Sequence, residues 1–171
     1  MIIMTDIIDS STSRYFEQYP CRLPVWWGRY GDVGPHPEGN GISGRKVVIR
    51  IEKKFKRIES VFAKILRAPK ELRRPLDIMN SLLWELCDGT RTFQVICEQL
   101  DSTYHEEIAP VVNRTTLGIA LLVSKNLMIV MDEPLDGKWN IGPGLTPSGQ
   151  TLAPLDERMK IDCSLLDGEQ Y

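Results

Sequence analysis

The chain has 171 residues, 42% of them hydrophobic and 26% charged, with a formal net charge of −2 at pH 7. This is the composition of a soluble protein with one domain and extensions, and it excludes a globally basic nucleic-acid-binding protein. No apolar run approaches the roughly 18 residues that a membrane-spanning helix needs, so no membrane span is expected. The four cysteines include no Cys-x-x-Cys pair, which favours a cytoplasmic protein with reduced thiols over a disulfide or metal-binding scaffold.

Two regions flank the predicted domain. The first, residues 1–45, combines aromatic residues such as Trp26 and Trp27 with the stretch GDVGPHPEGNGISG, which is not expected to form a regular element. The last, residues 132–171, carries four prolines, five glycines and a net charge of −5, and is predicted to be largely irregular. The domain between them, residues 46–131, is so small that we expect the N-terminal segment or a second subunit to pack on it.

The domain begins with an alternating segment. In KVVIRIEKK, residues 46–54, apolar and polar side chains alternate, which predicts a half-buried strand. Residues 55–70 have apolar side chains at helical spacing and predict a short amphipathic helix that ends before Pro69. Residues 71–77 predict a second extended segment. Pro75 places this segment at a sheet edge or end, because proline has no N–H for a ladder hydrogen bond.

Two amphipathic helices follow. Asp77 is a suitable N-cap for a helix to about Cys87, and Gly89 is placed to end it in a left-handed conformation. Thr92 can cap the next helix, whose apolar residues recur at i, i+3, i+4 and i+7. The apolar stripes consist of Ile78, Met79, Leu82, Leu83 and Leu86 in the first helix and Phe93, Ile96, Cys97 and Leu100 in the second.

A third helix and a final strand complete the domain. The helix is predicted from about Glu106 to Ser124, and Asn126 can close it in a left-handed conformation. Residues 127–131, LMIVM, predict a compact apolar strand. The order of elements predicts an α+β, winged-helix-like fold in which a small antiparallel sheet packs on a three-helix bundle.

The sequence offers few residues for catalysis. His36 and His105 are predicted in a loop and at a helix start, without a second ligand or base at useful spacing. Cys87 and Cys97 fall among apolar helical positions, where cysteine behaves as a small buried side chain. The stretch GPGLTPSGQT lacks the lysine and the strand-to-helix setting of a phosphate-binding loop. We therefore expect no catalytic residue, no metal site and no cofactor.

The basic stretch over residues 52–74 contains nine Lys or Arg and three Glu. It is either a solvated insert or, with its apolar residues, a contact for phosphate or a membrane surface. A DNA-reading winged helix would also place its third helix in a groove. Here that helix is predicted to open with Glu106 and Glu107, which phosphate would repel, so base readout is not expected.

Two features indicate a protein or peptide partner. Trp84 lies roughly opposite the apolar stripe of its helix, so either another element covers it or a partner contacts it. On the third helix, Arg114, Leu117 and Leu121 form a second face about 130° from the core stripe, at 3.6 residues per turn. That face packs on the rest of the chain, on a second subunit or on a partner. A peptide that adds as a strand to a sheet edge beside it would be such a partner.

The run RRPLDIMNSLLWELCDGTRTFQVICEQL, with the amphipathic helix and LMIVM that follow, resembles the PqqD-like family of peptide recognition elements. The shared pattern is an extended segment ending in Leu-Asp, a helix with Trp-x-Leu near its end, Asp-Gly, a basic residue and Thr, then a helix that carries Ile. The matching residues are Leu76, Asp77, Trp84, Leu86, Asp88, Gly89, Arg91, Thr92 and Ile96. The resemblance covers about residues 46–131, half of the chain.

The resemblance implies a non-catalytic adaptor that binds the leader of a ribosomally synthesised precursor peptide and presents it to a modifying enzyme, often a radical enzyme with an iron–sulfur cluster. The leader would add as a strand to the sheet edge and lie against the third helix. The implied peptide-binding residues are Leu72, Arg73, Arg74, Arg114, Leu117 and Leu121. Trp84 is a separate candidate for a partner contact.

Two alternatives to the adaptor stay open. One is a nucleic-acid-binding winged helix that uses the basic stretch over residues 53–74. The other is a structural or oligomerising module, for example a homodimer that buries Trp84 and the second face of the third helix between its subunits.

Overall fold

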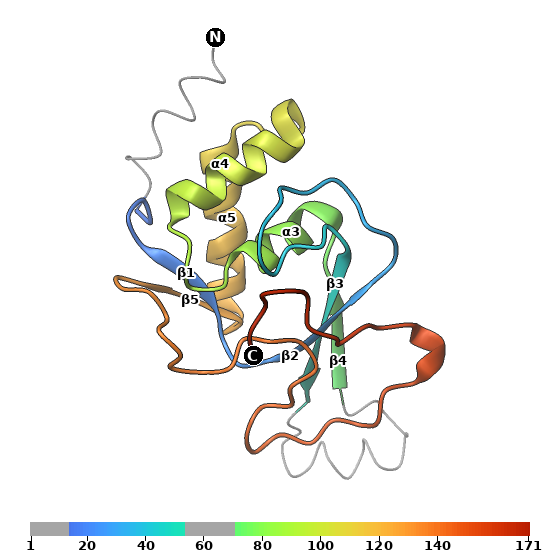
Figure 1. The fold of residues 1–171 in the computed structure, drawn as a ribbon. Coiled ribbons are helices and arrows are strands. Elements are labelled where there is room, and N and C mark those ends of the chain that lie inside the picture. The colour runs from blue at the N-terminus through green and yellow to red at the C-terminus, as the bar shows by residue number, and fades with distance from the viewer. Residues whose placement is uncertain (1–13, 54–70) are drawn as a thin grey trace.

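The computed structural model describes residues 14–53 and 71–171. Within these ranges the fold is α+β, with three α-helices and two small antiparallel sheets (Figure 1). The strands are β1 (Tyr19–Arg22), β2 (Trp26–Tyr30), β3 (Lys46–Glu52), β4 (Glu71–Pro75) and β5 (Met128–Met131); the α-helices are α3 (Ile78–Leu86), α4 (Phe93–Tyr104) and α5 (Val111–Ser124), and two 3₁₀ helices are η2 (His105–Ile108) and η3 (Glu157–Met159). The helix predicted over residues 55–70, and with it most of the basic stretch, lies outside the described residues.

Strands β2, β3 and β4 form an antiparallel sheet in that order. β3 confirms the predicted strand, and its core-facing side chains Val47 and Ile49 are fully buried. β4 confirms the second extended segment and lies at the edge of the sheet. Pro75 stands at the end of β4 opposite Val48, where its missing N–H costs no hydrogen bond to β3.

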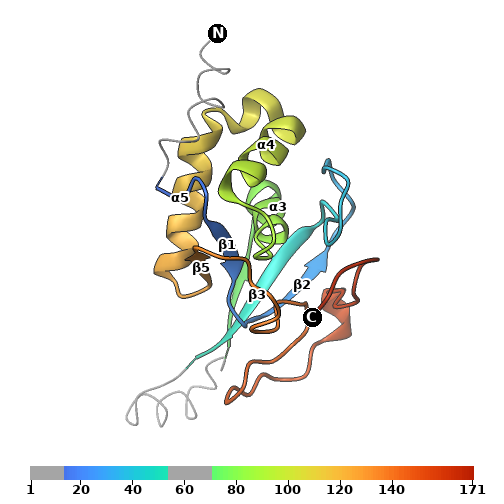
Figure 2. The same cartoon turned by 60° about the vertical axis from the view of Figure 1, so that its left-hand side comes forward.

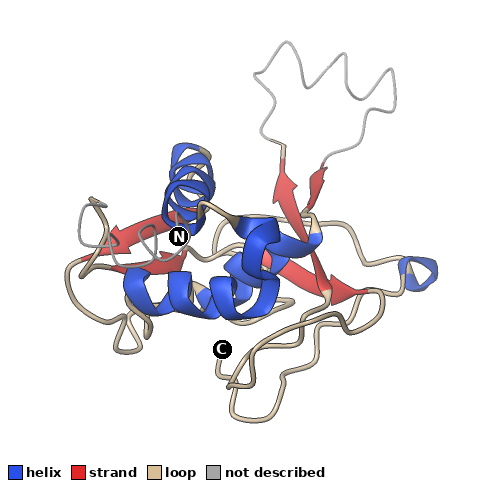
Figure 3. Ribbon diagram, turned by 90° about the horizontal axis from the view of Figure 1, so that it is seen from above, coloured by secondary structure: helices blue, strands red, loops and turns tan. Residues whose placement is uncertain are grey.

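Strands β1 and β5 form a separate two-stranded sheet, in which Tyr19 pairs with Met131 and Arg22 with Met128. The expectation of a single small sheet is therefore wrong, because the last strand pairs with the N-terminal segment and not with β3 or β4. An apolar run such as residues 127–131 indicates a buried strand but does not specify which segment pairs with it. Figure 3 shows the two sheets on opposite sides of the helices.

Both predicted helix caps are confirmed. The Asp77 carboxylate accepts a hydrogen bond of 2.7 Å from the Asn80 N–H at the start of α3. The Thr92 hydroxyl accepts one of 3.4 Å from the Val95 N–H at the start of α4. Each cap satisfies an N–H that has no partner within its helix and so defines where the helix begins.

The turn between α3 and α4 requires glycine. α3 ends at Leu86, and Gly89 has a φ of +81°, the predicted left-handed conformation. A Cβ atom at this position would also lie 2.6 Å from the Cβ of Leu135. Conformation and packing thus both exclude a side chain here.

Helix α5 begins later than predicted. Residues 105–108 form the 3₁₀ helix η2, and α5 runs from Val111 to Ser124. The predicted start at Glu106 is wrong because Pro110 has no N–H and interrupts the helical hydrogen bonding. Asn126 has a φ of +58°, as expected for the residue that closes the helix. None of the described helices is long and apolar enough to cross a membrane.

The N-terminal segment packs on the domain, as the small size of the domain predicted. Trp27 of β2 and Trp84 of α3 are buried against each other, with ring centroids 6.2 Å apart and ring planes at 76°. Tyr15 packs on Phe93 of α4 at a centroid distance of 5.9 Å. This segment therefore contributes both strands and aromatic side chains to the core.

The C-terminal segment lies along the β2 side of the three-stranded sheet (Figure 2). The Gly144 N–H donates to the Trp27 carbonyl at 2.8 Å, and Arg29 and Asp162 form a pair of backbone hydrogen bonds. The predicted domain boundaries at residues 45 and 132 stay predictions, but the regions beyond them contact the same sheet.

Candidate functional site

Strand β4 presents an open edge. The Leu76 N–H donates to the Val47 carbonyl at 2.8 Å, which makes this a hydrogen-bonded pair of the β3–β4 ladder. Because such pairs alternate along an antiparallel ladder, the backbone groups of Glu71, Arg73 and Pro75 point away from β3. Within the described residues, no strand other than β3 pairs with β4. The edge therefore offers the Glu71 and Arg73 N–H groups and three carbonyls to an added strand.

The side chains of Leu72 and Arg74 lie on the helix-covered face of the sheet. Each stands opposite an apolar residue of β3, Ile51 for Leu72 and Ile49 for Arg74, and directly opposed residues share a face. Leu72 is exposed, whereas the Nε atom of Arg74 is buried without a hydrogen-bond partner in the described structure. A buried guanidinium nitrogen without a hydrogen-bond partner is costly to the folded state.

The side chain of Arg73 lies on the other face of β4. It donates to the Glu71 carboxylate at 2.7 Å, and Arg50 of β3 makes an ion pair of 2.6 Å with the same carboxylate. The guanidinium of Arg50 stacks on Trp26, 4.4 Å from the ring centroid. Of the three predicted β4 residues, only Leu72 and Arg74 thus have side chains on the helix side, and Arg73 can contribute there through its backbone alone.

The contacts of Arg50 and Arg73 with Glu71 make the free energy of unfolding depend on pH. Burial opposes ionisation of Glu71, but the hydrogen bonds from Arg50 and Arg73 outweigh it and hold the Glu71 pKa below its ordinary value of 4.5. A lowered pKa in the folded state means that this stabilisation is fully present above pH 4.5 and is lost as the pH falls below that value. We expect Glu71→Gln to lower the free energy of unfolding at neutral pH by about 1 kcal/mol and to flatten its fall in acid.

Urea unfolding at a series of pH values measures both effects. The matched control is Glu98→Gln, an exposed carboxylate on α4 that makes no ion pair in the described part of the chain. If the free energies of unfolding of the wild type and Glu71→Gln fell in parallel as the pH is lowered, the prediction would be contradicted.

Helix α5 exposes the second face that its sequence predicted. Leu117 and Leu121 are 70% and 57% exposed, although each is a large apolar side chain. Arg114 is also exposed, and its guanidinium donates to the Glu107 carbonyl. The core face of α5 consists of Val111, Val112, Thr115, Ile119 and Leu122. The three predicted residues therefore share one solvent-facing side of the helix.

Helix α3 lies between β4 and α5 (Figure 1). On one side the Ser81 hydroxyl of α3 accepts a hydrogen bond of 2.8 Å from the Val47 N–H of β3. On the other side, a Cβ at Gly118 of α5 would lie 2.9 Å from the Leu83 side chain. The predicted β4 and α5 residues thus flank α3 and come from two separate elements.

Trp84 is covered by its own chain. The side chain is fully buried, and it packs on Trp27 and lies 5.9 Å from the Arg22 guanidinium. The sequence left two possibilities for Trp84, covering by another element or contact with a partner. The structure shows the first. A partner contact by Trp84 is excluded in this fold because the N-terminal segment occupies the space in front of it.

The opposite edge of the three-stranded sheet is closed by the C-terminal segment. The Arg29 N–H donates to the Asp162 carbonyl at 2.9 Å, and the Asp162 N–H donates back at 2.6 Å. The Asp162 carboxylate also pairs with Arg45 at 2.9 Å. Sequence reasoning missed this contact, because an acidic, glycine-containing segment has no local pattern that predicts strand pairing.

A buried ionic cluster beneath this contact was also missed. The Glu85 carboxylate of α3, which is not accessible to solvent, accepts hydrogen bonds from the Arg29 Nε at 2.8 Å, the Ser43 hydroxyl at 2.8 Å and the Gly44 N–H at 3.1 Å. The Glu169 carboxylate of the tail pairs with the other side of Arg29 at 2.8 Å. The cluster joins the helix, the loop before β3 and the tail, with the Arg29 guanidinium between the carboxylates of Glu85 and Glu169.

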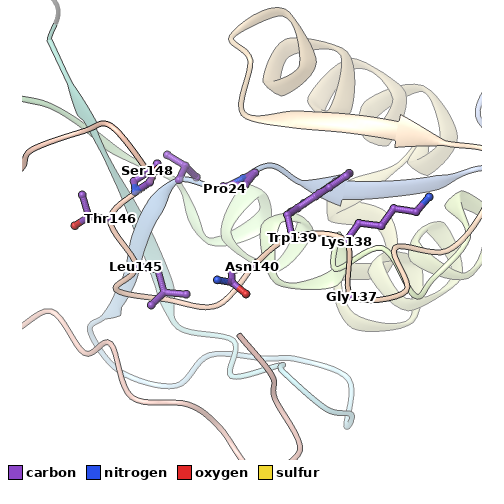
Figure 4. Close-up of a pocket in the computed structure, with 10 residues that line it drawn as sticks. Pro24, Gly137, Lys138, Trp139, Asn140, Leu145, Thr146 and Ser148 are labelled. Carbon is purple, nitrogen blue, oxygen red and sulfur yellow. The ribbon is translucent and has the colours of Figure 1, made fainter.

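Two cavities lie on the tail side of the molecule, away from β4. One, of about 380 Å³, is formed by the tail and the turn between β1 and β2, with Trp139 and Pro24 in its wall (Figure 4). The other, of about 530 Å³, lies between the tail and the α3–α4 turn and includes Glu169 and Arg91. Trp139 is anchored by a 2.8 Å hydrogen bond from its Nε1 to the Arg22 carbonyl.

The residues with catalytic potential lie apart. Burial raises the pKa of the Cys21 and Cys97 thiols to about 12, so neither is a thiolate at neutral pH. His36 bonds to its own neighbour, the Pro37 carbonyl, at 2.9 Å. In the ranges that the structure describes, no three His, Cys, Asp or Glu residues are grouped as a metal site would require.

Comparison with known proteins adds no relative: no protein-family model matches the sequence, no curated protein is similar to it, and no solved structure matches the fold.

Proposed function

We propose that this protein is a non-catalytic peptide-binding adaptor, in which an extended peptide adds as a fourth strand to β4 and lies against α5. The chain order of β3, β4, three α-helices and β5 is the order expected of a winged-helix-like, PqqD-like domain, and it supports this proposal. The proposed peptide is the leader of a precursor peptide, which the adaptor presents to a modifying enzyme.

One observation carries this proposal: β4 is the open edge of a sheet whose other edge is closed. The tail occupies β2 through the Arg29–Asp162 pair, whereas the outward backbone groups of Arg73 and Pro75 have no strand partner in the described chain. An open edge beside exposed apolar side chains fits a strand-adding peptide.

The side chains near the edge define the peptide that fits. Leu72, Leu117 and Leu121 offer apolar contacts, and they are among the most exposed large hydrophobic residues of the described chain. Arg74 of β4 and Arg114 of α5 carry positive charge. We therefore expect a peptide with alternating apolar residues and at least one carboxylate.

The test begins with a selection from a library of random displayed peptides on the immobilised full-length chain. Enriched peptides should be apolar and acidic, and titration with one of them should shift the amide NMR signals of residues 71–76 and 111–121. Leu117→Asp should weaken binding by roughly tenfold or more, because it places a charge in the apolar contact and repels the peptide carboxylate.

Val33→Asp is the matched control, because Val33 is 65% exposed and lies in the loop between β2 and β3. It should leave peptide affinity within about twofold of the wild type. Selected peptides that bind Leu117→Asp as well as the wild type, or that leave the β4 amides unmoved, would contradict binding at this edge.

A further inference from the structure

A buried arginine lines the cavity of about 530 Å³ between the tail and the α3–α4 turn. Arg22 of β1 is 2% exposed, and it makes no ion pair within the described chain. Buried charges are normally paired, because moving a charge out of water is costly. Burial lowers the pKa of the Arg22 guanidinium, and the nearby carboxylates of Asp88 and Glu169 offset this only in part. The charge of Arg22 therefore lacks a counter-ion.

One nitrogen of this guanidinium stays available for a ligand. The Arg22 Nε donates to the Ile141 carbonyl at 3.3 Å, and Nη1 donates to the carbonyls of Trp84 and Glu85 at 2.7 and 3.0 Å. Nη2 makes no hydrogen bond in the described structure, and it is not among the buried atoms that lack a partner. Solvent therefore reaches Nη2, while the three other bonds fix its orientation.

The cavity wall also carries an unpaired negative charge. It holds four carboxylates and two arginines, so a ligand with a carboxylate alone would meet a net negative field. Asp136 is exposed and makes no ion pair in the ranges described. The carboxylates that are paired are those of Glu85 and Glu169, each with Arg29, and that of Asp88, with Arg91. The wall thus has two unpaired charges of opposite sign.

The rest of the wall includes apolar side chains. Trp139 is held by the hydrogen bond from its Nε1 to the Arg22 carbonyl, which places an indole close to the arginine. Leu135, Ile141 and Tyr171 also line the cavity. Its volume is in the range of roughly 300–1,000 Å³ that is usual for small-molecule sites. A ligand that fits this wall has one positive group, one negative group and an apolar part.

We propose that this cavity binds an apolar α-amino acid. Its carboxylate accepts a hydrogen bond from the Arg22 Nη2, its ammonium group pairs with Asp136, and its side chain lies against Trp139. One molecule then neutralises both unpaired charges of the wall. The cavity lies away from β4, so this binding does not depend on the proposed peptide site.

Isothermal titration calorimetry of the full-length chain with L-phenylalanine measures the binding. We expect saturable binding of one molecule per chain. Two analogues each lack one charge: 3-phenylpropionate has no ammonium group, and phenethylamine has no carboxylate. Both should bind at least about tenfold more weakly than phenylalanine, because each leaves one charge of the wall unpaired.

Asp136→Asn tests the assignment in the protein. Asp136 lies in an exposed turn with a φ of +49°, a conformation that asparagine also adopts, so the fold should be retained. The variant should bind phenylalanine about tenfold more weakly and should not weaken the binding of 3-phenylpropionate. Arg22 is unsuitable for this test, because its bonds to the α3 carbonyls also support the fold.

Glu133→Gln is the matched control, because it removes an exposed carboxylate of the same segment that does not line the cavity. It should leave the affinity for phenylalanine within about twofold of the wild type. Three results would overturn the proposal: no binding of phenylalanine or leucine, equal affinities for phenylalanine and 3-phenylpropionate, or an Asp136→Asn variant with the wild-type affinity for phenylalanine.

Discussion

Replacing Glu85 by alanine is expected to lower the free energy of unfolding by about 3–5 kcal/mol, the cost of removing one partner from a buried ion pair. The variant leaves the Arg29 guanidinium, which is 1% exposed, with the Glu169 carboxylate as its one remaining ion-pair partner among the described residues. It also removes the acceptor for the Ser43 hydroxyl and the Gly44 N–H. Buried donors without an acceptor add to the loss.

Urea unfolding followed by circular dichroism measures this effect. Glu85→Gln, which keeps the shape and one acceptor oxygen, should lose less, and it provides a folded variant if the alanine variant fails to fold. Glu98→Ala on the exposed side of α4 is the matched control and should change the free energy by less than about 0.5 kcal/mol. A loss below about 1 kcal/mol for Glu85→Ala would mean that the cluster does not hold the tail and helix together.

Replacing Trp84 by alanine should cost about 3–5 kcal/mol, the usual range for a large aromatic residue in a core. The indole is fully buried and makes an edge-to-face contact with Trp27. Its loss would leave a cavity between the N-terminal segment and α3. The loss should thus loosen the contact between two parts of the chain that are far apart in sequence.

Trp84→Phe separates packing from hydrogen bonding. The indole Nε1 of Trp84 is buried without a hydrogen-bond partner in the described structure, so phenylalanine keeps most of the aromatic contact and removes an unsatisfied donor. We expect it to cost no more than about 2 kcal/mol. An alanine variant as stable as the phenylalanine variant would show that Trp84 is not part of the core, and would reopen a partner contact by this residue.

The local elements of the candidate site could be predicted from the sequence. The edge position of β4 followed from Pro75, and the exposed face of α5 followed from the spacing of Leu117 and Leu121. Both depend on rules that act within a few residues: the missing N–H of proline and the helical repeat. The sequence did not predict on which face of the sheet each β4 side chain lies. That is why Arg73 was grouped with Arg74, although the ladder to β3 places them on opposite faces.

The contacts that hold the N-terminal and C-terminal segments on the rest of the fold join residues far apart in the sequence. No local sequence pattern predicts such contacts. Arg29 meets Glu169, and Trp84 meets Trp27, through contacts that only the folded backbone brings together. The same holds for β5, whose apolar run predicted a strand but not its pairing with β1. An ion pair or a strand pair is specified by two segments at once, so neither segment alone predicts it.

The sequence by itself determined strand β3, the order of strands and α-helices from β4 onward, the caps at Asp77 and Thr92, and the glycine turn. Each of these depends on side chains and backbone groups that are close together in the sequence. The tertiary structure alone decided which sheet edges are closed, since edge closure depends on where distant segments pack. It buried Trp84, covered β2 with the tail and left β4 with β3 as its one strand partner in the described chain. The search for function is therefore directed to the β4 edge, because unpaired backbone groups and the exposed side chain of Leu72 occur there together.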